Sequence, residues 1–343
     1  MEYEYGTLYW QYCYALTIHT MKHLIPCYLL FFSSIAFAQT GKPDTSFTVY
    51  SAFEKEKKNY PFITIAKPQN LKTVKIKSGI VYHTIGTKKL HLDVFYPVYK
   101  KRKPLPAVLL IFGGGWRSGN RSMNNAVAER LAANGYVAIS VGYRLSSEAL
   151  YPAAIHDIKT SIRWIRAHAL QFKIDTNKIA VMGFSAGGQL AALVGTTNGK
   201  TKFDGNGPYS NYSSNVSAVI DIDGILAFDH PESGESGFNP AKPSAATLWF
   251  GGTLKEKPEL WQEASALTHV SKNTVPILFV NSSLPRFHAG RDDMIKKLDS
   301  LKIYSIVHTI PDTPHPFWLF NPWFEPTMQY TLGFLDKIHK GLK

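Results

Sequence analysis

Short apolar runs alternate with amphipathic stretches along the chain, from about residue 72 to the C-terminus. Residues 107–112 (AVLLIF), 137–141 and 179–183 are continuous apolar runs, which are typical of strands buried on both faces of a sheet. Residues 152–172 instead place apolar side chains three or four positions apart, the spacing of an amphipathic helix. The same patterns predict further strands at 74–80, 90–96, 216–222, 275–281 and 304–310, and further helices at 125–134, 186–194, 294–301 and 327–339.

This alternation predicts an α/β fold, in which a mostly parallel central sheet carries helices on both faces. The sequence has no internal repeat and no low-complexity linker, so we interpret residues 71–343 as one domain. Residues 39–70 are polar and rich in lysine, and are expected to form a lead-in segment. Two stretches rich in Gly, Pro, Ser and Asn, 199–215 and 228–262, are expected to be loop insertions that cover a site.

The segment from Met21 to Ala38 (MKHLIPCYLLFFSSIAFA) has the pattern of a secretory signal peptide. A basic start precedes an apolar run that is too short for a stable membrane span, and small residues mark a cleavage point after Ala38. We therefore expect this segment to be removed and the mature protein to be secreted or periplasmic, with no membrane anchor after cleavage. Residues 1–20 are interpreted as an upstream segment in front of a second start.

Residues 183–187 read Gly-Phe-Ser-Ala-Gly and lie between a predicted strand and a predicted helix. In this context the motif predicts a nucleophile elbow, a sharp turn that holds the hydroxyl of Ser185 away from the sheet. The helix that follows offers backbone N–H groups, first that of Ala186, to a developing anion. We therefore predict Ser185 as a catalytic nucleophile.

A glycine-rich loop, Phe112-Gly-Gly-Gly-Trp116, follows the first buried strand. Because glycines let the backbone approach a reacting carbonyl closely, we predict an oxyanion hole made of the N–H groups of Gly113, Gly114 and Ala186. A phosphate-binding loop is the alternative, but the loop lacks the Lys-Ser/Thr ending and the spaced glycines that such loops need.

These motifs together resemble the α/β-hydrolase superfamily, and most closely its acetyl-esterase and carbohydrate-esterase branch, which is related to hormone-sensitive lipase and to bacterial feruloyl esterase-like proteins. The resemblance extends over residues 76–340 and includes 140–145 (SVGYRL) and 152–157 (PAAIHD). It implies the α/β-hydrolase fold and hydrolysis of carboxylic esters by an activated serine. One departure is Phe112, because this branch usually has histidine there.

This superfamily orders its catalytic residues along the chain as Ser, then Asp or Glu, then His. His315 is the predicted base, because it follows the last predicted strand in a proline-bracketed loop that suits a fixed imidazole. His308 falls within that strand, and His339 is expected to face solvent from the terminal helix. The other histidines after Ser185 are His230, His269 and His288.

The catalytic acid has more than one candidate. Its usual place is the loop after the strand at 275–281, and the first carboxylates there are Asp292 and Asp293, at the start of a predicted helix. We predict Asp292, in the role of orienting the imidazole and stabilising its charged form. Asp293 stays open as an alternative, as do Asp221 and Asp223 in the preceding run VIDIDG.

No cofactor and no metal is predicted. The sequence contains neither a His-Glu-x-x-His pattern nor a dinucleotide fingerprint. Both cysteines, Cys13 and Cys27, lie in the part that is expected to be removed, which predicts a mature chain without a disulfide or a thiolate metal site. The expected reaction, acyl transfer to water through an acyl-enzyme, needs only the serine, the histidine and the oxyanion donors.

Aromatic and basic residues near the predicted site suggest a carbohydrate ester as the substrate. Trp116 and Trp318 offer aromatic faces to sugar rings, and Arg286 and His288 place positive charge beside the predicted acid. We predict deacetylation of a plant-type polysaccharide, pectin or hemicellulose, or of a small-molecule ester. Removal of methyl esters from uronates and a non-catalytic glycan-binding role are the alternatives. A serine peptidase acting after proline is disfavoured, because the chain is too short for the additional domain that such enzymes usually carry.

The net charge of the chain adds one argument about the partner and leaves the predicted reaction unchanged. The chain has 343 residues, with 38 Lys and Arg against 25 Asp and Glu, and a net charge of +13. Its basic clusters, at 55–58, 72–77 and 100–103, form no basic helix or recognition motif, so no nucleic-acid partner is expected. The charge instead favours an anionic glycan as the partner.

Overall fold

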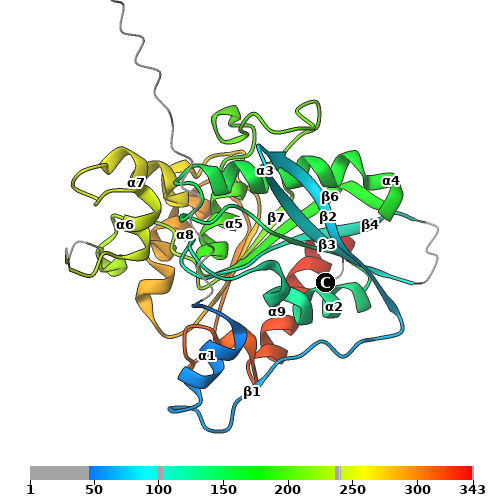
Figure 1. The fold of residues 1–343 in the computed structure, drawn as a ribbon, viewed down its shortest axis with the longest axis horizontal. Helices are drawn as coiled ribbons and strands as arrows, with labels where there is room; N and C mark the ends of the chain where they lie inside the picture. The colour runs from blue at the N-terminus through cyan, green and yellow to red at the C-terminus, as the bar shows by residue number, and fades with distance from the viewer. Residues whose placement is uncertain (1–45, 99–102, 236–238, 240, 342–343) are drawn as a thin grey trace, which may run out of the picture. The chain divides into compact units, whose positions relative to one another are not determined.

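The computed structural model describes residues 46–98, 103–235, 239 and 241–341. Its centre is an eight-stranded sheet in the order β2-β3-β5-β4-β6-β7-β8-β9 (Figure 1). β2, β3 and β5 pair antiparallel, and all further pairs, from β5–β4 to β8–β9, are parallel. The mostly parallel sheet is therefore confirmed. The strands are β2 Val74–Ile85, β3 Lys88–Pro97, β4 Leu105–Ile111, β5 Val137–Val141, β6 Ile174–Phe184, β7 Ala218–Ile222, β8 Ile277–Asn281 and β9 Ser305–Thr309.

Helices cover both faces of the sheet, as predicted (Figure 1). Successive residues of the central strand β4 point to opposite faces and are all buried. Val108 and Leu110 belong to one core with α2 and α9, whereas Leu109 and Ile111 belong to another with α3, α5 and α8. Because both faces are covered, the strand reads as a continuous apolar run. The helices are α1 Val49–Glu56, α2 Asn125–Ala133, α3 Ala153–Ala167, α4 Ala169–Phe172, α5 Ala186–Thr196, α6 Ala245–Phe250, α7 Pro258–Ala264, α8 Arg291–Ser300 and α9 Phe324–Lys340.

The described part of the expected lead-in segment is folded. Thr48 and Ser51 form a capping box that starts α1, each side chain accepting the backbone N–H of the other at 2.9 Å. The chain then forms β1 (Thr64–Ile65), which pairs antiparallel with β10 (Phe320–Asn321). The lead-in segment is thus attached to the loop that follows His315.

The N-terminal predictions fall outside the described residues. The upstream segment 1–20, the signal peptide at 21–38 and both cysteines lie there, so cleavage and secretion stay predictions. Of the helices that the structure describes, none combines the length and apolar character needed to cross a membrane.

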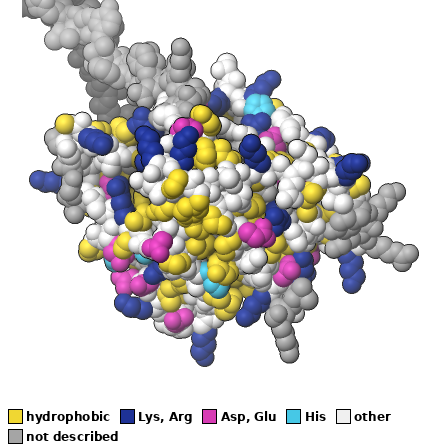
Figure 2. Space-filling model, turned by 90° about the horizontal axis from the view of Figure 1, so that it is seen from below, with side chains coloured by type: hydrophobic (Ala, Val, Ile, Leu, Met, Phe, Trp, Pro, Cys, Tyr) yellow, Lys and Arg dark blue, Asp and Glu magenta, His cyan; other side chains and the backbone are white. Residues whose placement is uncertain are grey.

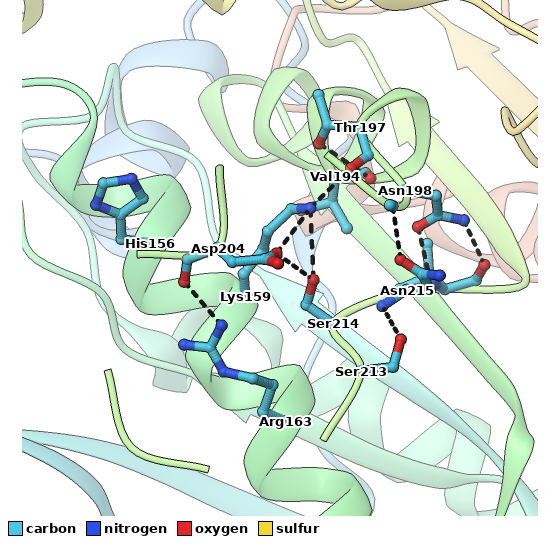
Figure 3. Close-up of polar contacts among 12 residues, drawn as sticks. His156, Lys159, Arg163, Val194, Thr197, Asn198, Asp204, Ser213, Ser214 and Asn215 are labelled. Atoms are coloured by element: carbon cyan, nitrogen blue, oxygen red, sulfur yellow. Dashed lines mark hydrogen bonds and ion pairs between the residues drawn. The ribbon is translucent and has the colours of Figure 1, made fainter. Parts of the chain in front are cut away.

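The two expected loop insertions differ from one another. Within 199–215 the backbone is mostly irregular, and it is fastened to α3 by a buried lysine (Figure 3). The Nζ of Lys159 donates to Thr197 O at 2.9 Å and lies 3.4 Å from Asp204 Oδ1, which also accepts from Ser214 Oγ at 2.5 Å. Burial lowers the pKa of Lys159. The second insertion, 228–262, is not a plain loop, because it contains α6 and the first five residues of α7.

His339 does not face solvent as expected. Its side chain is buried between α9 and the sheet, and its Nε2 lies 2.9 Å from Ser217 Oγ. Burial lowers the pKa of His339 to about 4, whereas an unfolded chain has a histidine pKa of about 6.5. Between these two values the unfolded state binds the proton and the folded state does not, so stability falls as the pH drops through this window.

Replacing this histidine is expected to flatten the dependence of stability on pH. From pH 7 to pH 4.5 the wild type should lose about 2 kcal/mol more unfolding free energy than His339→Gln. Urea unfolding of both proteins at the two pH values measures the difference. An equal loss in both proteins would show that His339 does not titrate with this shift.

Candidate active site

Ser185 occupies a strained turn between β6 and α5. Its φ of 55° and ψ of −121° lie outside the usual regions, and the turn is held by a hydrogen bond from Ser185 N to Ile222 O of 2.8 Å. Small neighbours are required, because a Cβ on Gly183 would lie 1.9 Å from the carbonyl oxygen of Gly187. The pattern Gly-x-Ser-x-Gly is therefore a packing requirement of this turn.

A chain of hydrogen bonds connects Ser185 to a histidine and an aspartate. Ser185 Oγ lies 2.8 Å from His315 Nε2, and His315 Nδ1 lies 3.0 Å from Asp223 Oδ2. A carboxylate at Nδ1 favours the tautomer that carries the ring proton there, which leaves Nε2 free to accept the proton of the serine. This is the arrangement by which a hydroxyl becomes a nucleophile.

The predicted acid was wrong: Asp223, not Asp292, contacts the histidine. The side chain of Asp292 is 70% exposed and accepts a hydrogen bond from Arg291 Nε at 2.8 Å, which lowers the pKa of Asp292. Asp293 pairs with Lys296 and His230. Both carboxylates are on the first turn of α8, where the positive end of the helix dipole stabilises negative charge.

Asp223 reaches the histidine because it follows the end of β7, the strand beside β6. Asp223 is 1% exposed, and its carboxylate accepts hydrogen bonds from the backbone N and the Oγ of Ser282, at 2.8 and 2.6 Å. Ser282 comes directly after β8, in the loop where the acid was expected. That loop therefore supplies a hydrogen-bond donor to Asp223 in place of the acid. Asp221, the other carboxylate of this run, points away from the triad to Gly224 N, and burial raises its pKa well above the usual range.

Aromatic rings hold the imidazole in place. Phe287 stacks on His315 with ring centroids 3.5 Å apart, and Trp318 meets the imidazole edge-on at 5.4 Å. Trp318 is buried and also stacks on Phe184, so it supports the histidine and does not line the cavity beside Ser185.

His288 is also buried and does not line that cavity, and burial lowers its pKa. Trp318 and His288, which were predicted to contact the substrate, therefore do not line the cavity beside Ser185.

The glycine loop lies directly against the nucleophile. A Cβ on Gly113 would be 2.6 Å from Phe184 O and 3.0 Å from Ser185 Cβ, so only glycine fits there. Between described residues, no hydrogen bond engages the N–H groups of Gly113, Gly114 or Ala186. These donors thus stay available beside Ser185, which is what an oxyanion hole requires.

Phe112, which stands where histidine is usual, has a packing role. Its ring stacks on that of Tyr143 with centroids 4.4 Å apart, and Tyr143 Oη donates to Phe112 O at 2.9 Å. Burial raises the pKa of Tyr143, which keeps the hydroxyl protonated as a donor. The backbone at the start of the glycine loop is thereby fixed without a histidine.

A cavity of about 120 Å³ adjoins Ser185. Trp116 forms one wall, held by a hydrogen bond from its Nε1 to Gln189 Oε1 of 2.9 Å and stacked on Trp249. Arg286 also lines the cavity, and its Nη2 lies 3.4 Å from Glu235 Oε1. The other lining residues are mostly apolar, namely Ile225, Phe228, Ala245, Ala246 and Phe287. Trp116 and Arg286 therefore line the cavity beside Ser185, and their contact with a substrate stays a prediction.

No metal site accompanies this arrangement in the described part of the chain, where no group of three or more His, Cys, Asp or Glu side chains is suited to hold an ion.

The sheet, the elbow and the Ser–His–Asp chain define the α/β-hydrolase fold. Within it, the BD-FAE family model matches residues 92–304, and the chain belongs to this family. Among curated proteins, esterase LipC of Mycobacterium tuberculosis is 34% identical over 257 residues, which are 73% of this chain and 62% of LipC. The arylesterase of Saccharolobus solfataricus is 35% identical over 106 residues, 30% of this chain and 34% of that protein. The chain thus spans less than two thirds of these relatives.

Solved structures agree on the fold. A truncated carbohydrate esterase from gut microbiota superposes with a TM-score of 0.66 and 23% identity, covering 79% of this chain and 99% of that one. A bifunctional GH43-CE protein of Bacteroides eggerthii also gives a TM-score of 0.66, with 25% identity over 77% of this chain and 38% of that one.

Proposed function

We propose that the protein is a serine esterase that removes short acyl groups, acetyl above all, from carbohydrates. The observation that carries this proposal is the continuous chain from Ser185 through His315 to Asp223, with unengaged N–H donors beside the serine. A non-catalytic homologue needs none of these contacts, so the intact chain favours an enzyme over a glycan-binding protein.

The geometry supports hydrolysis in two steps. His315 Nε2 takes the proton of Ser185 as its Oγ attacks the ester carbonyl, and the N–H groups of Gly113, Gly114 and Ala186 stabilise the oxyanion. The tetrahedral intermediate collapses, the C–O bond to the alcohol breaks, and Nε2 returns the proton to the departing oxygen. Water then attacks the acyl-enzyme by the same route and regenerates the serine.

The size of the cavity beside Ser185 favours a small acyl group. Its volume is about 120 Å³, and a cavity of roughly 150 Å³ just holds a benzene ring. An acetyl group fits this space, whereas a feruloyl group or a whole uronate ring exceeds it. This argues against the methyl-ester alternative, in which the acyl part is the uronate.

A carbohydrate alcohol is supported by similarity and by charge. The carbohydrate esterases among the structural neighbours share the fold, and Arg286 adds a cation to the lining beside Ser185. Figure 2 shows Lys and Arg side chains spread over the face in view, without one dense basic patch. Such a distribution suits weak attraction of an anionic polysaccharide such as pectin better than nucleic-acid binding.

A series of esters with acyl groups of increasing length tests this proposal. We expect kcat/KM to fall at least about tenfold from p-nitrophenyl acetate to the octanoate, because added methylenes overfill the cavity. Methyl ferulate should be a poor substrate for the same reason. Faster hydrolysis of octanoate or ferulate than of acetate would contradict the assignment of a short acyl group.

A further inference from the structure

A second cavity, of about 530 Å³, is lined by the catalytic histidine. One wall is the loop with His315, together with Phe287 of η5 (Pro285–His288). The opposite wall comes from α1 and the residues after it, chiefly Glu56, Asn59 and Tyr60. Phe287 lines both this cavity and the one beside Ser185, so the two are neighbours. The smaller cavity is lined by Ser185 and Asp223, and the larger one by His315.

The reaction mechanism places the acyl part of an ester next to one cavity and its alcohol part next to the other. The acyl carbon must lie at Ser185 and the oxyanion donors, next to the 120 Å³ cavity. The departing alcohol oxygen must lie at His315 Nε2, because that atom returns the proton to it. The alcohol part therefore extends past His315, where the larger cavity begins.

We propose that this second cavity binds the alcohol part of the substrate, a sugar or short oligosaccharide, with α1 as its outer wall. This inference rests on the proposed function. The volume is within the 300–1,000 Å³ typical of small-molecule sites. Its lining mixes aromatic rings, from Tyr60 and Phe287, with polar groups from Glu56 and Asn59, the combination that suits the apolar faces and the hydroxyl groups of a sugar.

Glu56 is the residue on which the proposal can be tested. It is only 8% exposed although it lines the cavity, and its Oε1 lies 3.2 Å from Lys55 Nζ, which also lines it. The oxygens of a carboxyl group in such a place can accept hydrogen bonds from sugar hydroxyls. Glu54 is on the same helix but is not part of the lining, so it provides a matched control.

The outer wall lies outside the region that the family model matches. Residues 46–60 precede the region matched by the family model, which begins at residue 92. They are nonetheless held firmly, because Tyr60 packs edge-on against Trp323 at 5.3 Å and β1 pairs with β10. α1 also lies on the side of the molecule that Figure 2 views, where hydrophobic side chains gather in the middle (Figure 2). This N-terminal segment therefore determines specificity on the alcohol side of the site, next to His315.

Comparing two acetyl esters tests the assignment. The full-length protein is assayed on an acetylated xylo-oligosaccharide and on ethyl acetate, whose alcohol is too short to reach α1. We expect Glu56→Gln to lower the ratio of kcat/KM for the oligosaccharide to that for ethyl acetate about tenfold, mainly through KM. Asn59→Ala should lower the same ratio, and Glu54→Gln should leave it at the wild-type value.

The outcomes separate the two proposals. A ratio that Glu56→Gln and Asn59→Ala leave unchanged, or a wild type that prefers ethyl acetate, overturns the sugar subsite while esterase activity stands. A folded wild type that hydrolyses neither ester overturns the proposed function, and the subsite with it.

Discussion

Ser185→Ala is expected to lower kcat on p-nitrophenyl acetate by about 10⁶-fold. The remaining rate is the catalysis that the oxyanion hole and substrate binding provide without a nucleophile. The reason for the loss is that Ser185 Oγ is the atom within 2.8 Å of His315 Nε2, and without it no acyl-enzyme forms. Steady-state release of p-nitrophenol at neutral pH measures the loss.

The control for this variant is its stability. Alanine accepts the strained φ of 55° no better than serine does, so urea unfolding should show a similar or slightly smaller free energy. A folded Ser185→Ala protein that keeps the wild-type rate would show that another group attacks the ester.

Asp223→Asn is expected to lower kcat by about 10⁴-fold at neutral pH, whereas Asp292→Asn should leave it unchanged. An amide at residue 223 turns an NH₂ group or a weaker acceptor toward His315 Nδ1, so the ring no longer keeps its proton there and Nε2 is no longer a free acceptor. Asp292 is exposed and paired with Arg291, and lies apart from this chain of contacts.

The two variants form a matched pair, because each exchanges one carboxylate for its amide. Circular dichroism and urea unfolding check that Asp223→Asn still folds with its contacts to Ser282 rearranged. Loss of activity in Asp292→Asn together with a wild-type rate in Asp223→Asn would restore the acid expected from sequence and reject the one described above.

Much of the fold could be predicted because burial on two faces leaves a continuous apolar pattern. β4 and β6 were found from their apolar runs, and α3 from its helical spacing. α1 was missed because it has eight residues and is buried only through contacts with distant residues, such as Phe53 against Phe320 at 6.1 Å. Such contacts join segments that are far apart in the sequence and leave no local pattern.

The sequence likewise predicts some residues of the candidate site and misses another. Ser185 and the glycine loop carry local signatures, because close backbone packing demands small residues at fixed positions. The acid has no such signature, since both β7 and β8 end close enough to the histidine to deliver a carboxylate. One signal was present: Asp223 follows the end of a buried strand, at the edge of the sheet where parallel strands place functional groups. Asp292 begins a helix, where a carboxylate has a simpler role.

The central claim is that Ser185, His315 and Asp223 together remove short acyl groups from carbohydrates. Acetate release from an acetylated xylo-oligosaccharide, measured side by side for the wild type and Ser185→Ala, tests it most directly. The account predicts steady acetate release by the wild type and none above background by the variant. No release by a folded wild type, or equal release by both proteins, would contradict it.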